Sequence, residues 1–300
     1  MKILFTFPGQ GGQRPGMLAM IPDREAILTQ ARAVLGDEVD TLDSADALQH
    51  TRAVQLCLLI AGVAWARELQ RQGVDPQMVS GLSIGAFPAA VIAGALDFAS
   101  ALRLVALRGD LMEQAYPEGY GLTAIMGLTR PRVEALMQGH EVYLANLNAE
   151  TQFVIAGRDE ALAEVAQLAL RAGASKAQRL AVSVPSHCAL LDKPAAELAK
   201  AFAGASLRRP RSAYLSGSTA RVLWDPQRIA DDLAMNMARP VHWQEAMVAA
   251  DERDARLAIE MPPGGVLTCL TRQAGWRGET IALERSGLDV ARHLAQRLSD

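Results

Sequence analysis

The chain has few of the residues on which several classes of protein depend. Its 300 residues include only three cysteines, Cys57, Cys188 and Cys269, which are widely separated and never spaced as CxxC. An odd, scattered set of this kind favours neither a disulfide framework nor a zinc site, and it is typical of a reducing compartment. We therefore expect a cytoplasmic protein without a metal site.

The sequence also lacks an excess of charge of one sign and lacks long apolar runs. Its 30 Lys and Arg residues nearly balance 33 Asp and Glu residues, and the formal net charge is −3. This balance does not indicate a general nucleic-acid binder or a membrane-surface protein. The N-terminal residues 1–12 hold a single lysine and a short apolar run, too brief for a signal peptide or a membrane span. We expect a soluble, unprocessed chain that binds neither nucleic acid nor membrane.

Hydrophobic residues make up half of the sequence, and they follow an alternation of strands and helices. The apolar run 3–7 opens into a glycine-rich loop, a helical pattern covers 51–73, and a short apolar run precedes residue 81. Alternation of this kind is typical of a parallel sheet covered by helices. The sequence predicts an α/β fold whose large domain has a parallel sheet and an α/β-hydrolase-like core.

The pattern changes between residues 121 and 184. There it predicts a strand, a helix, two strands, a helix and a strand, which is the βαββαβ order of a ferredoxin-like unit. We expect this segment, 121–184, to form a small domain inserted into a large catalytic domain made of 1–120 and 185–300.

Ser83 lies in the stretch "GLSIG", between a predicted strand and a predicted helix. A nucleophile on such a sharp turn needs small neighbours, and Gly81 and Gly85 meet that need. The following helix would direct backbone N–H groups toward negative charge that develops near the hydroxyl, and Ile84 N–H is the natural oxyanion donor. Because GxSxG also occurs by chance, the alternative is an ordinary serine at the end of a strand.

A serine nucleophile needs a general base, which is usually a histidine. The candidates are His50, His140, His187, His242 and His293. His187 is favoured because it lies where the small domain returns the chain to the large one, and domain junctions often hold binding sites. No acidic residue stands out as the third member of a triad, so a carbonyl group could orient the imidazole instead. The alternative is a histidine at a helix N-terminus that has no chemical role.

Arg108 lies in a predicted helix where an apolar residue is expected. Its neighbours at helical spacing are Leu104, Val105, Leu111 and Met112, so Arg108 falls on the buried face. An unpaired buried guanidinium would cost several kcal/mol, which predicts a partner in the protein or a ligand carboxylate bound in bidentate fashion. The alternatives are a structural ion pair and a side chain that reaches the surface.

Taken together, these motifs resemble the malonyl-CoA:acyl carrier protein transacylase family over nearly the whole chain. Five motifs stand in that family's order, and they are "FPGQGGQ" at 7–13, "GLSIG" at 81–85, "LRGDLMEQAYPEG" at 107–119, "VSVPSHC" at 182–188 and "RPVHW" at 239–243. Within the family, the first motif and the altered serine motif are most similar to the epsilon subunit of malonate decarboxylase, a dedicated malonyl transferase.

The resemblance implies a role for each residue that matches a family motif. Ser83 would be the acylated nucleophile, and His187 would be its base. The backbone N–H groups of Gln10 and Ile84 would form the oxyanion hole. Arg108 would bind the free carboxylate of the malonyl group.

The sequence departs from the family pattern at three positions. Asn236 stands where the family usually has a glutamine whose carbonyl orients the histidine. Leu82 and Ala86 replace a histidine and an acid in the usual "GHSLGE" motif. Neither lost group is needed for the acyl-transfer roles, and the change favours the malonate decarboxylase partner over an enzyme of fatty-acid synthesis.

The implied activity is transfer of a malonyl group from malonyl-CoA, through an acylated serine, to the thiol of an acyl carrier protein. Malonyl-CoA is the substrate, and no cofactor is expected. The carrier would present a phosphopantetheine-type thiol arm, which in malonate decarboxylase is a dephospho-CoA derivative, and other malonate decarboxylase subunits are further partners. The alternatives are a malonyl transacylase of fatty-acid synthesis, a serine esterase or thioesterase, and a non-catalytic scaffold. Candidate carrier-docking residues, each of which could equally be ordinary solvated surface, are Arg14, Lys193, Arg208, Arg209 and Arg211.

Overall fold

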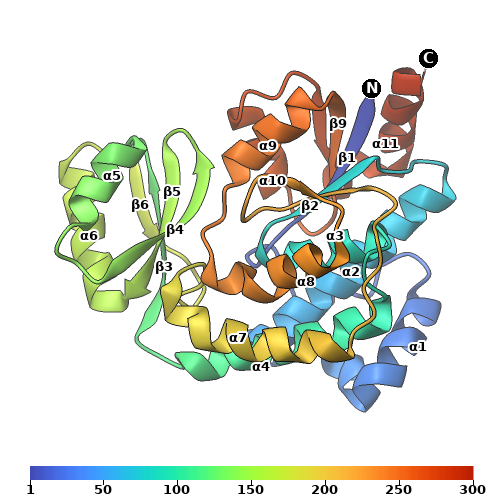
Figure 1. Ribbon diagram of the computed structural model, residues 1–300, viewed down its shortest axis with the longest axis horizontal. Helices are drawn as coiled ribbons and strands as arrows, with labels where there is room; N and C mark the ends of the chain where they lie inside the picture. Colours follow the sequence, from blue (N-terminus) through green and yellow to red (C-terminus); the bar gives the residue numbers. More distant parts are fainter. Residues whose placement is uncertain (300) are drawn as a thin grey trace.

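The computed structural model describes residues 1–299 (Figure 1). Most of these residues belong to, or pack around, the larger of two sheets. Its six strands lie in the order β10-β9-β1-β2-β7-β8. They are β1 (Lys2–Phe7), β2 (Met78–Gly81), β7 (Ala213–Leu215), β8 (Val222–Leu223), β9 (Ala255–Glu260) and β10 (Glu279–Ala282). All neighbouring pairs are parallel except β7 and β8, which are antiparallel. The predicted parallel sheet of an α/β fold is confirmed.

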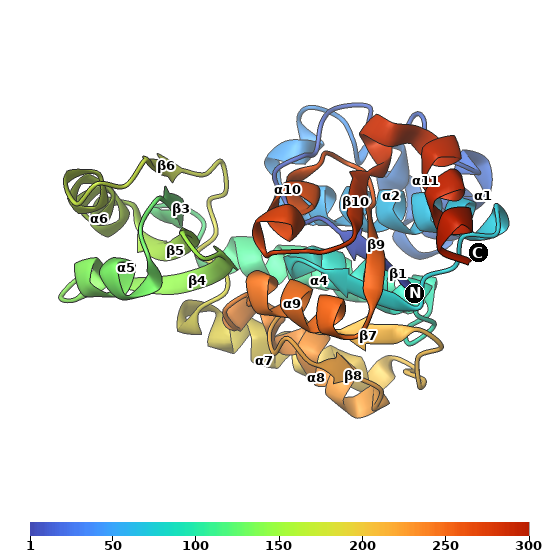
Figure 2. The same cartoon turned by 90° about the horizontal axis from the view of Figure 1, so that it is seen from above.

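Helices cover both faces of this sheet (Figure 2). They are α1 (Arg24–Leu35), α2 (Thr51–Arg71), α3 (Ala86–Ile92), α4 (Phe98–Ala115), α7 (Asp192–Ala201), α8 (Pro226–Met235), α9 (Trp243–Glu252), α10 (Val266–Gln273) and α11 (Leu283–Ser299). Side chains of β1 alternate between two cores, because Phe5 and Phe7 pack with residues of α2 and α3 whereas Leu4 packs with residues of α9 and α10. No helix within residues 1–299 has both the length and the apolar character needed to cross a membrane.

The smaller sheet is antiparallel and has the strand order β4-β5-β3-β6. Along the chain its elements are β3 (Tyr120–Met126), α5 (Arg130–Met137), β4 (Val142–Ala149), β5 (Gln152–Arg158), α6 (Asp159–Arg171) and β6 (Lys176–Arg179). The predicted βαββαβ order is therefore present, and Figure 1 shows this unit standing to one side of the large sheet. Helices α5 and α6 pack on one face of the sheet around Val133 and Val165.

Strand β6 is shorter than the sequence predicts, because the pattern of residues 177–184 favours a strand over that whole range. It pairs only with β3 and ends at Arg179. The Arg179 guanidinium donates to the carbonyls of Leu180 and Val182 at 2.7 and 2.9 Å. Because one guanidinium binds these carbonyls, the chain curls around it and leaves the sheet instead of continuing as a strand.

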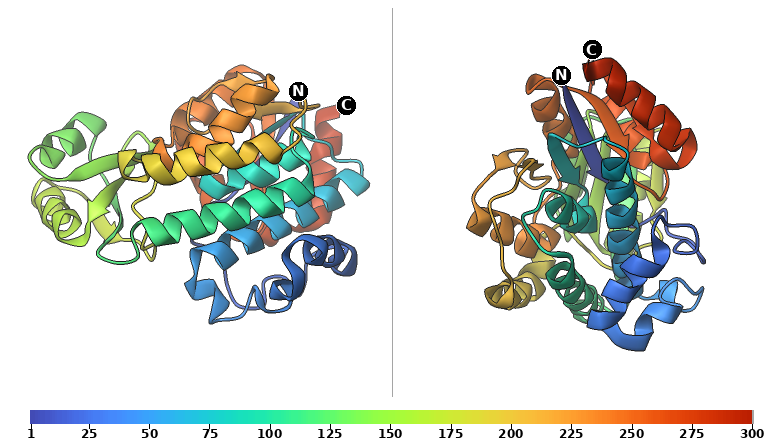
Figure 3. Two further views of the ribbon diagram at one scale, coloured as in Figure 1. Left: turned by 60° about the horizontal axis from the view of Figure 1, so that its bottom comes forward. Right: turned by 90° about the vertical axis from the view of Figure 1, so that its right-hand side faces the viewer.

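The small unit is joined to the large one by more than its two chain connections. Leu147 N donates to Val241 O at 2.7 Å, and Val241 N donates to Ala145 O at 2.8 Å. Helices α4 and α7, which precede and follow the small unit, pack side by side and lead toward it (Figure 3, left). A further bond, from His187 N to Met237 O at 2.6 Å, holds the segment around residues 236–241 against the junction at residues 185–188.

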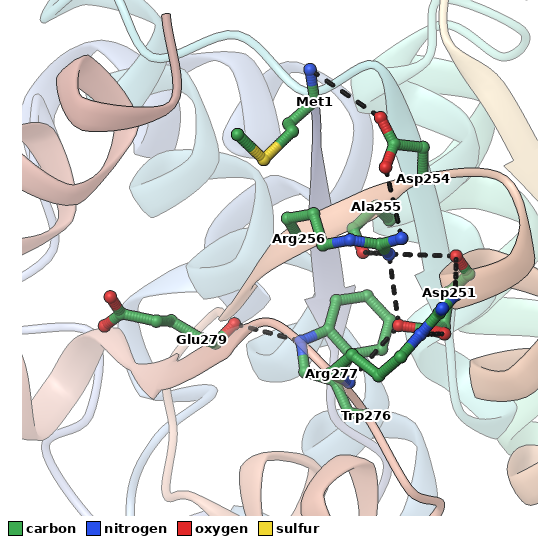
Figure 4. Close-up of polar contacts among 8 residues, drawn as sticks. All are labelled: Met1, Asp251, Asp254, Ala255, Arg256, Trp276, Arg277 and Glu279. Atoms are coloured by element: carbon green, nitrogen blue, oxygen red, sulfur yellow. Dashed lines mark hydrogen bonds and ion pairs between the residues drawn. The ribbon is translucent and has the colours of Figure 1, made fainter. Parts of the chain in front are cut away.

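A polar network ties together the amino-terminal ends of β1, β9 and β10 (Figure 4). The nearly buried Asp251 carboxylate accepts from Arg256 Nη1 at 3.1 Å and from Arg277 Nε at 2.6 Å. Asp254 pairs with Arg256 and with the N-terminal amine of Met1. Since this network lies where the parallel strands begin, it anchors the edge of the sheet opposite the loops that follow β1 and β2.

Candidate active site

Ser83 sits on a sharp turn directly after β2. Its φ is 58°, a left-handed conformation that is unusual for a residue with a side chain. A Cβ placed on Gly81 would lie 2.0 Å from the carbonyl of Gly85, and one on Gly85 would lie 2.1 Å from Phe7 O. Both glycines are thus required by close backbone approach, as expected of a nucleophile turn between a strand and a helix. The turn leaves Ser83 only partly buried.

The glycine-rich loop that follows β1 packs against this turn. A Cβ on Gly9 would lie 2.9 Å from the Leu82 side chain and 3.7 Å from Ser83 Cβ. Gln10, the next residue, therefore has its backbone beside Ser83, at the same edge of the sheet as Ile84. This arrangement puts the two predicted oxyanion donors on neighbouring loops, and their role stays a prediction.

His187 meets Ser83 across the junction between the two units. Its Nε2 lies 2.9 Å from Ser83 Oγ. Its Nδ1 lies 2.8 Å from Asn236 O and 3.2 Å from Arg239 O. Because both of these partners are carbonyls that can only accept, Nδ1 carries the proton and Nε2 is free to accept the hydroxyl proton of Ser83. The imidazole is oriented by carbonyls rather than by a carboxylate.

Burial keeps His187 in its neutral form. The ring is almost inaccessible to solvent, and this burial, together with the nearby positive charge of Arg108, lowers the pKa of His187 to about 4. The two carbonyl hydrogen bonds oppose this change but do not outweigh it. A histidine with such a pKa is unprotonated, and so able to act as a base, across the whole neutral range.

We expect the reactivity of Ser83 to persist into mildly acidic solution for this reason. With a pKa of about 4, nearly all of His187 is neutral at about pH 5.5, whereas an ordinary histidine would be only about one tenth neutral there. The rate of Ser83 modification by phenylmethylsulfonyl fluoride, which has no titrating group, should thus stay nearly constant from pH 8 to about pH 5.5. A tenfold decline centred near pH 6.5 would contradict this assignment. His293→Gln, a change at an exposed position of α11, serves as the control and should behave like wild type.

Arg108 lies on the buried face of α4, as predicted, and is fully buried. Its Nη1 donates to Gln55 Oε1 at 2.8 Å, and its Nη2 donates to Asn236 Oδ1 at 2.9 Å and to Ser83 Oγ at 3.2 Å. Burial lowers its pKa to about 9, so it is still charged at neutral pH. Within residues 1–299 no carboxylate forms an ion pair with it, and its Nε has no hydrogen-bond partner. An uncompensated buried cation beside Ser83 is chemically suited to bind a carboxylate.

Asn236 lies against His187, where it was predicted to orient the imidazole, and its side chain makes further contacts in the site. The carbonyl that accepts from His187 is its backbone carbonyl, which any residue type would supply. Its side chain instead accepts from Arg108 and donates to Ser83 O at 3.2 Å. Replacement of glutamine by asparagine therefore leaves the orientation of His187 intact.

Two residues that form hydrogen bonds in the site were not identified from the sequence. Arg239 O is the second acceptor of the His187 proton, and a backbone carbonyl leaves no signal in a sequence. Gln55 is fully buried and accepts from Arg108. It is a lone polar residue in the apolar helical run 53–64, and that isolation could have identified it.

Cys188 adjoins the base but is not suited to act as a nucleophile. It is buried, and its Sγ donates to Pro185 O at 3.2 Å. Burial raises the pKa of the thiol to about 11, which leaves almost no thiolate at neutral pH. Cys188 is therefore an ordinary buried cysteine.

Comparison with known proteins places this geometry in a family. Residues 4–286 match the family described as acyl transferase domain. The malonyl CoA-acyl carrier protein transacylase of Escherichia coli strain K12 is 37% identical over 285 residues, which cover 91% of this chain and 92% of that protein. The solved malonyl CoA-acyl carrier protein transacylase of Coxiella burnetii has a TM-score of 0.91 and 32% identity, with 100% of this chain and 98% of that one covered.

A further solved structure is a type II PKS acyl-carrier protein in complex with its malonyl-transacylase. Its matching chain has a TM-score of 0.91 and 34% identity, and the match covers 98% of this chain and 99% of that one. Sequence and fold agree along nearly the full length in each comparison. The chain belongs to the acyl transferase domain family, among the malonyl CoA-acyl carrier protein transacylases.

Proposed function

We propose that this protein transfers a malonyl group from malonyl-CoA, through an ester on Ser83, to the thiol of an acyl carrier protein. The observation that carries the proposal is that Ser83 Oγ lies within hydrogen-bond distance of both neutral His187 and the uncompensated cation of Arg108. A serine and its base account for acyl transfer, and the buried cation accounts for a substrate that carries a second, free carboxylate.

In the first half-reaction, His187 Nε2 accepts the proton of Ser83 as Oγ attacks the thioester carbonyl. The N–H groups of Gln10 and Ile84 hold the resulting oxyanion, and loss of one such donor typically costs about 10²- to 10³-fold in rate. The tetrahedral intermediate collapses with cleavage of the C–S bond. His187 returns the proton to the leaving sulfur, which departs as free CoA.

In the second half-reaction, the carrier thiol takes the place of CoA. His187 accepts the thiol proton, the sulfur attacks the ester on Ser83, and the C–O bond breaks as the proton returns to Oγ. Each step is assigned to a group of this chain, and the proposal includes no metal or cofactor.

The malonyl carboxylate contributes to substrate binding, and it also assists the acylation step. Protonation of His187 is opposed by the charge of Arg108. A malonyl carboxylate that neutralises Arg108 removes this opposition when the imidazolium forms, whereas an acetyl group does not. Binding energy at Arg108 therefore stabilises the transition state of acylation in particular.

The physiological setting that we propose is malonate decarboxylase. Its support is the altered nucleophile turn, where Leu82 and Ala86 stand in place of the polar residues of the usual family motif. Ala86 is buried, and Leu82 contacts the Gly9 loop beside Ser83. The immediate surroundings of the nucleophile are thus more apolar than the usual motif would make them.

Transfer from malonyl-CoA to two forms of one carrier protein tests this setting. One form carries a phosphopantetheine arm, and the other carries a dephospho-CoA-derived arm. We expect kcat/KM for the second form to be higher by about tenfold or more, a difference of the size that contacts to one polar group supply. A preference for phosphopantetheine would indicate fatty-acid synthesis instead. Release of free malonate with neither carrier loaded would indicate a hydrolase.

A further inference from the structure

We propose that a pocket lined by arginines, remote from Ser83, binds a small anion with two or more phosphate groups. The pocket has a volume of about 380 Å³ and is lined by Arg67, Arg208, Arg209 and Arg211. It lies after the carboxyl end of α3 and at the amino-terminal end of α4, where Val91, Gly94 and Phe98 also line it.

The pocket is separated from the acylation site by the length of α3. Ser83 precedes the first turn of this helix, whereas the pocket follows its last turn. Along α4, Arg108 is ten residues beyond Phe98, which corresponds to about 15 Å at 1.5 Å per residue. A ligand in the pocket is therefore distinct from a malonyl group held by Arg108.

The arginine-bearing segment is fixed by its backbone. Arg208 N donates to Ala95 O at 2.9 Å, and Arg211 N donates to Ala93 O at 2.7 Å. Leu207 forms an isolated antiparallel bridge with Leu96, and the Arg211 side chain lies across Gly94, 3.0 Å from where a Cβ would stand. Arg208 and Arg211 thus project from a fixed backbone that needs little ordering when an anion binds. Arg67 reaches the pocket from α2, and the Arg209 guanidinium carbon lies 5.4 Å from the Trp224 ring centre.

Few carboxylates of the protein neutralise the positive charges in the pocket. Within residues 1–299 none of the four arginines takes part in an ion pair, whereas Arg52, Arg179 and Arg277 each pair with a carboxylate. Asp97 is the one carboxylate among the lining residues, and it already accepts from Ser100 N as the cap of α4. Arg67 is half-buried, and its pKa is lowered by that burial and by the charge of Arg71. A bound polyanion would relieve this concentration of positive charge.

The shape of the site favours a small anion over a protein surface. The arginines line a concave pocket rather than a flat patch, and Arg67 lies on Phe98 with its guanidinium carbon 5.2 Å from the ring centre. Guanidinium groups bind phosphate oxygens in a bidentate manner, and several of them around one cavity match a diphosphate. Free pyrophosphate and the diphosphate of a nucleotide share this chemistry.

Isothermal titration of the whole protein with inorganic pyrophosphate at low salt tests the proposal. We expect saturable binding to the wild type, and affinity about tenfold or more lower in Arg208→Gln/Arg211→Gln, since two charge-assisted contacts are lost. Arg171→Gln, which removes an equally exposed arginine that lies outside any ion pair in residues 1–299, should bind as wild type does. The rate of Ser83 acylation should be unchanged in both variants. Equal affinity in the double variant and the wild type, or no saturable binding, would overturn the site.

Two further titrations identify the source of the anion. ADP binding more tightly than pyrophosphate would indicate a nucleotide ligand, and the reverse order would indicate free polyphosphate. If pyrophosphate does not bind while the double variant loses affinity for the acyl carrier protein, the arginines form a protein-docking surface and the proposal is wrong.

Discussion

Replacing Ser83 with alanine is expected to abolish the covalent malonyl adduct that forms when the protein is mixed with malonyl-CoA. The hydroxyl oxygen lies 2.9 Å from His187 Nε2, and alanine leaves no atom to be acylated there. Turnover should fall on the order of 10⁴-fold or more, as is usual when a nucleophile is removed. Intact-protein mass spectrometry after brief mixing measures the adduct directly.

Ser80→Ala is the matched control for this prediction. Ser80 lies three residues earlier in β2, is fully buried and donates to Leu215 O at 2.9 Å. Its replacement costs one hydrogen bond of about 1 kcal/mol but removes no reacting atom. It should retain the adduct. An adduct of undiminished yield in Ser83→Ala would reject Ser83 as the nucleophile.

Replacing Arg108 with methionine is expected to remove the preference for malonyl-CoA over acetyl-CoA. The guanidinium is the buried cation available to a free carboxylate, and an acetyl group has none to offer it. Breaking a buried ion pair by loss of one partner typically costs about 3–5 kcal/mol, or roughly 10²- to 5 × 10³-fold in the malonyl-to-acetyl ratio of acylation rates. Single-turnover acylation with each thioester gives that ratio.

The ratio also separates recognition from folding. Arg108 binds Gln55 and Asn236, so its loss is expected to destabilise the protein as well. Partial unfolding lowers both rates by the same factor and leaves their ratio unchanged. Arg108→Lys keeps the charge but loses the bidentate geometry, so an intermediate ratio is expected. A malonyl preference that survives in Arg108→Met would exclude Arg108 from substrate recognition.

Local pattern was sufficient to predict much of the architecture. Strand and helix periodicities predicted the βαββαβ unit, because each element there buries one face at its own regular spacing. They failed at residues 180–184, where the apolar run favours a strand but the Arg179 guanidinium binds the carbonyls that a neighbouring strand would have bound. Tertiary contacts override local propensity in such places.

Much about the candidate site was also readable from single residues. The burial of Arg108 followed from its apolar neighbours on α4, and the need for small residues around Ser83 followed from steric limits on a sharp turn. The hydrogen-bond partners of Arg108, in contrast, could not be inferred from its neighbours in the sequence. Gln55 and Asn236 are 53 and 128 residues away along the chain, and no local rule relates such positions.

The sequence by itself determined that an α/β sheet and a βαββαβ unit form, that Ser83 stands on a glycine-flanked turn, and where a buried cation lies. These properties depend on neighbours a few residues apart, through helical and strand periodicity and the conformational freedom of glycine. Only the tertiary structure decided that carbonyls rather than a carboxylate orient His187, that the Asn236 side chain serves Arg108, and that the four arginines Arg67, Arg208, Arg209 and Arg211 share one pocket. The physical reason is that hydrogen bonds and charge compensation act between groups that chain folding brings together, and their partners are distant in the sequence.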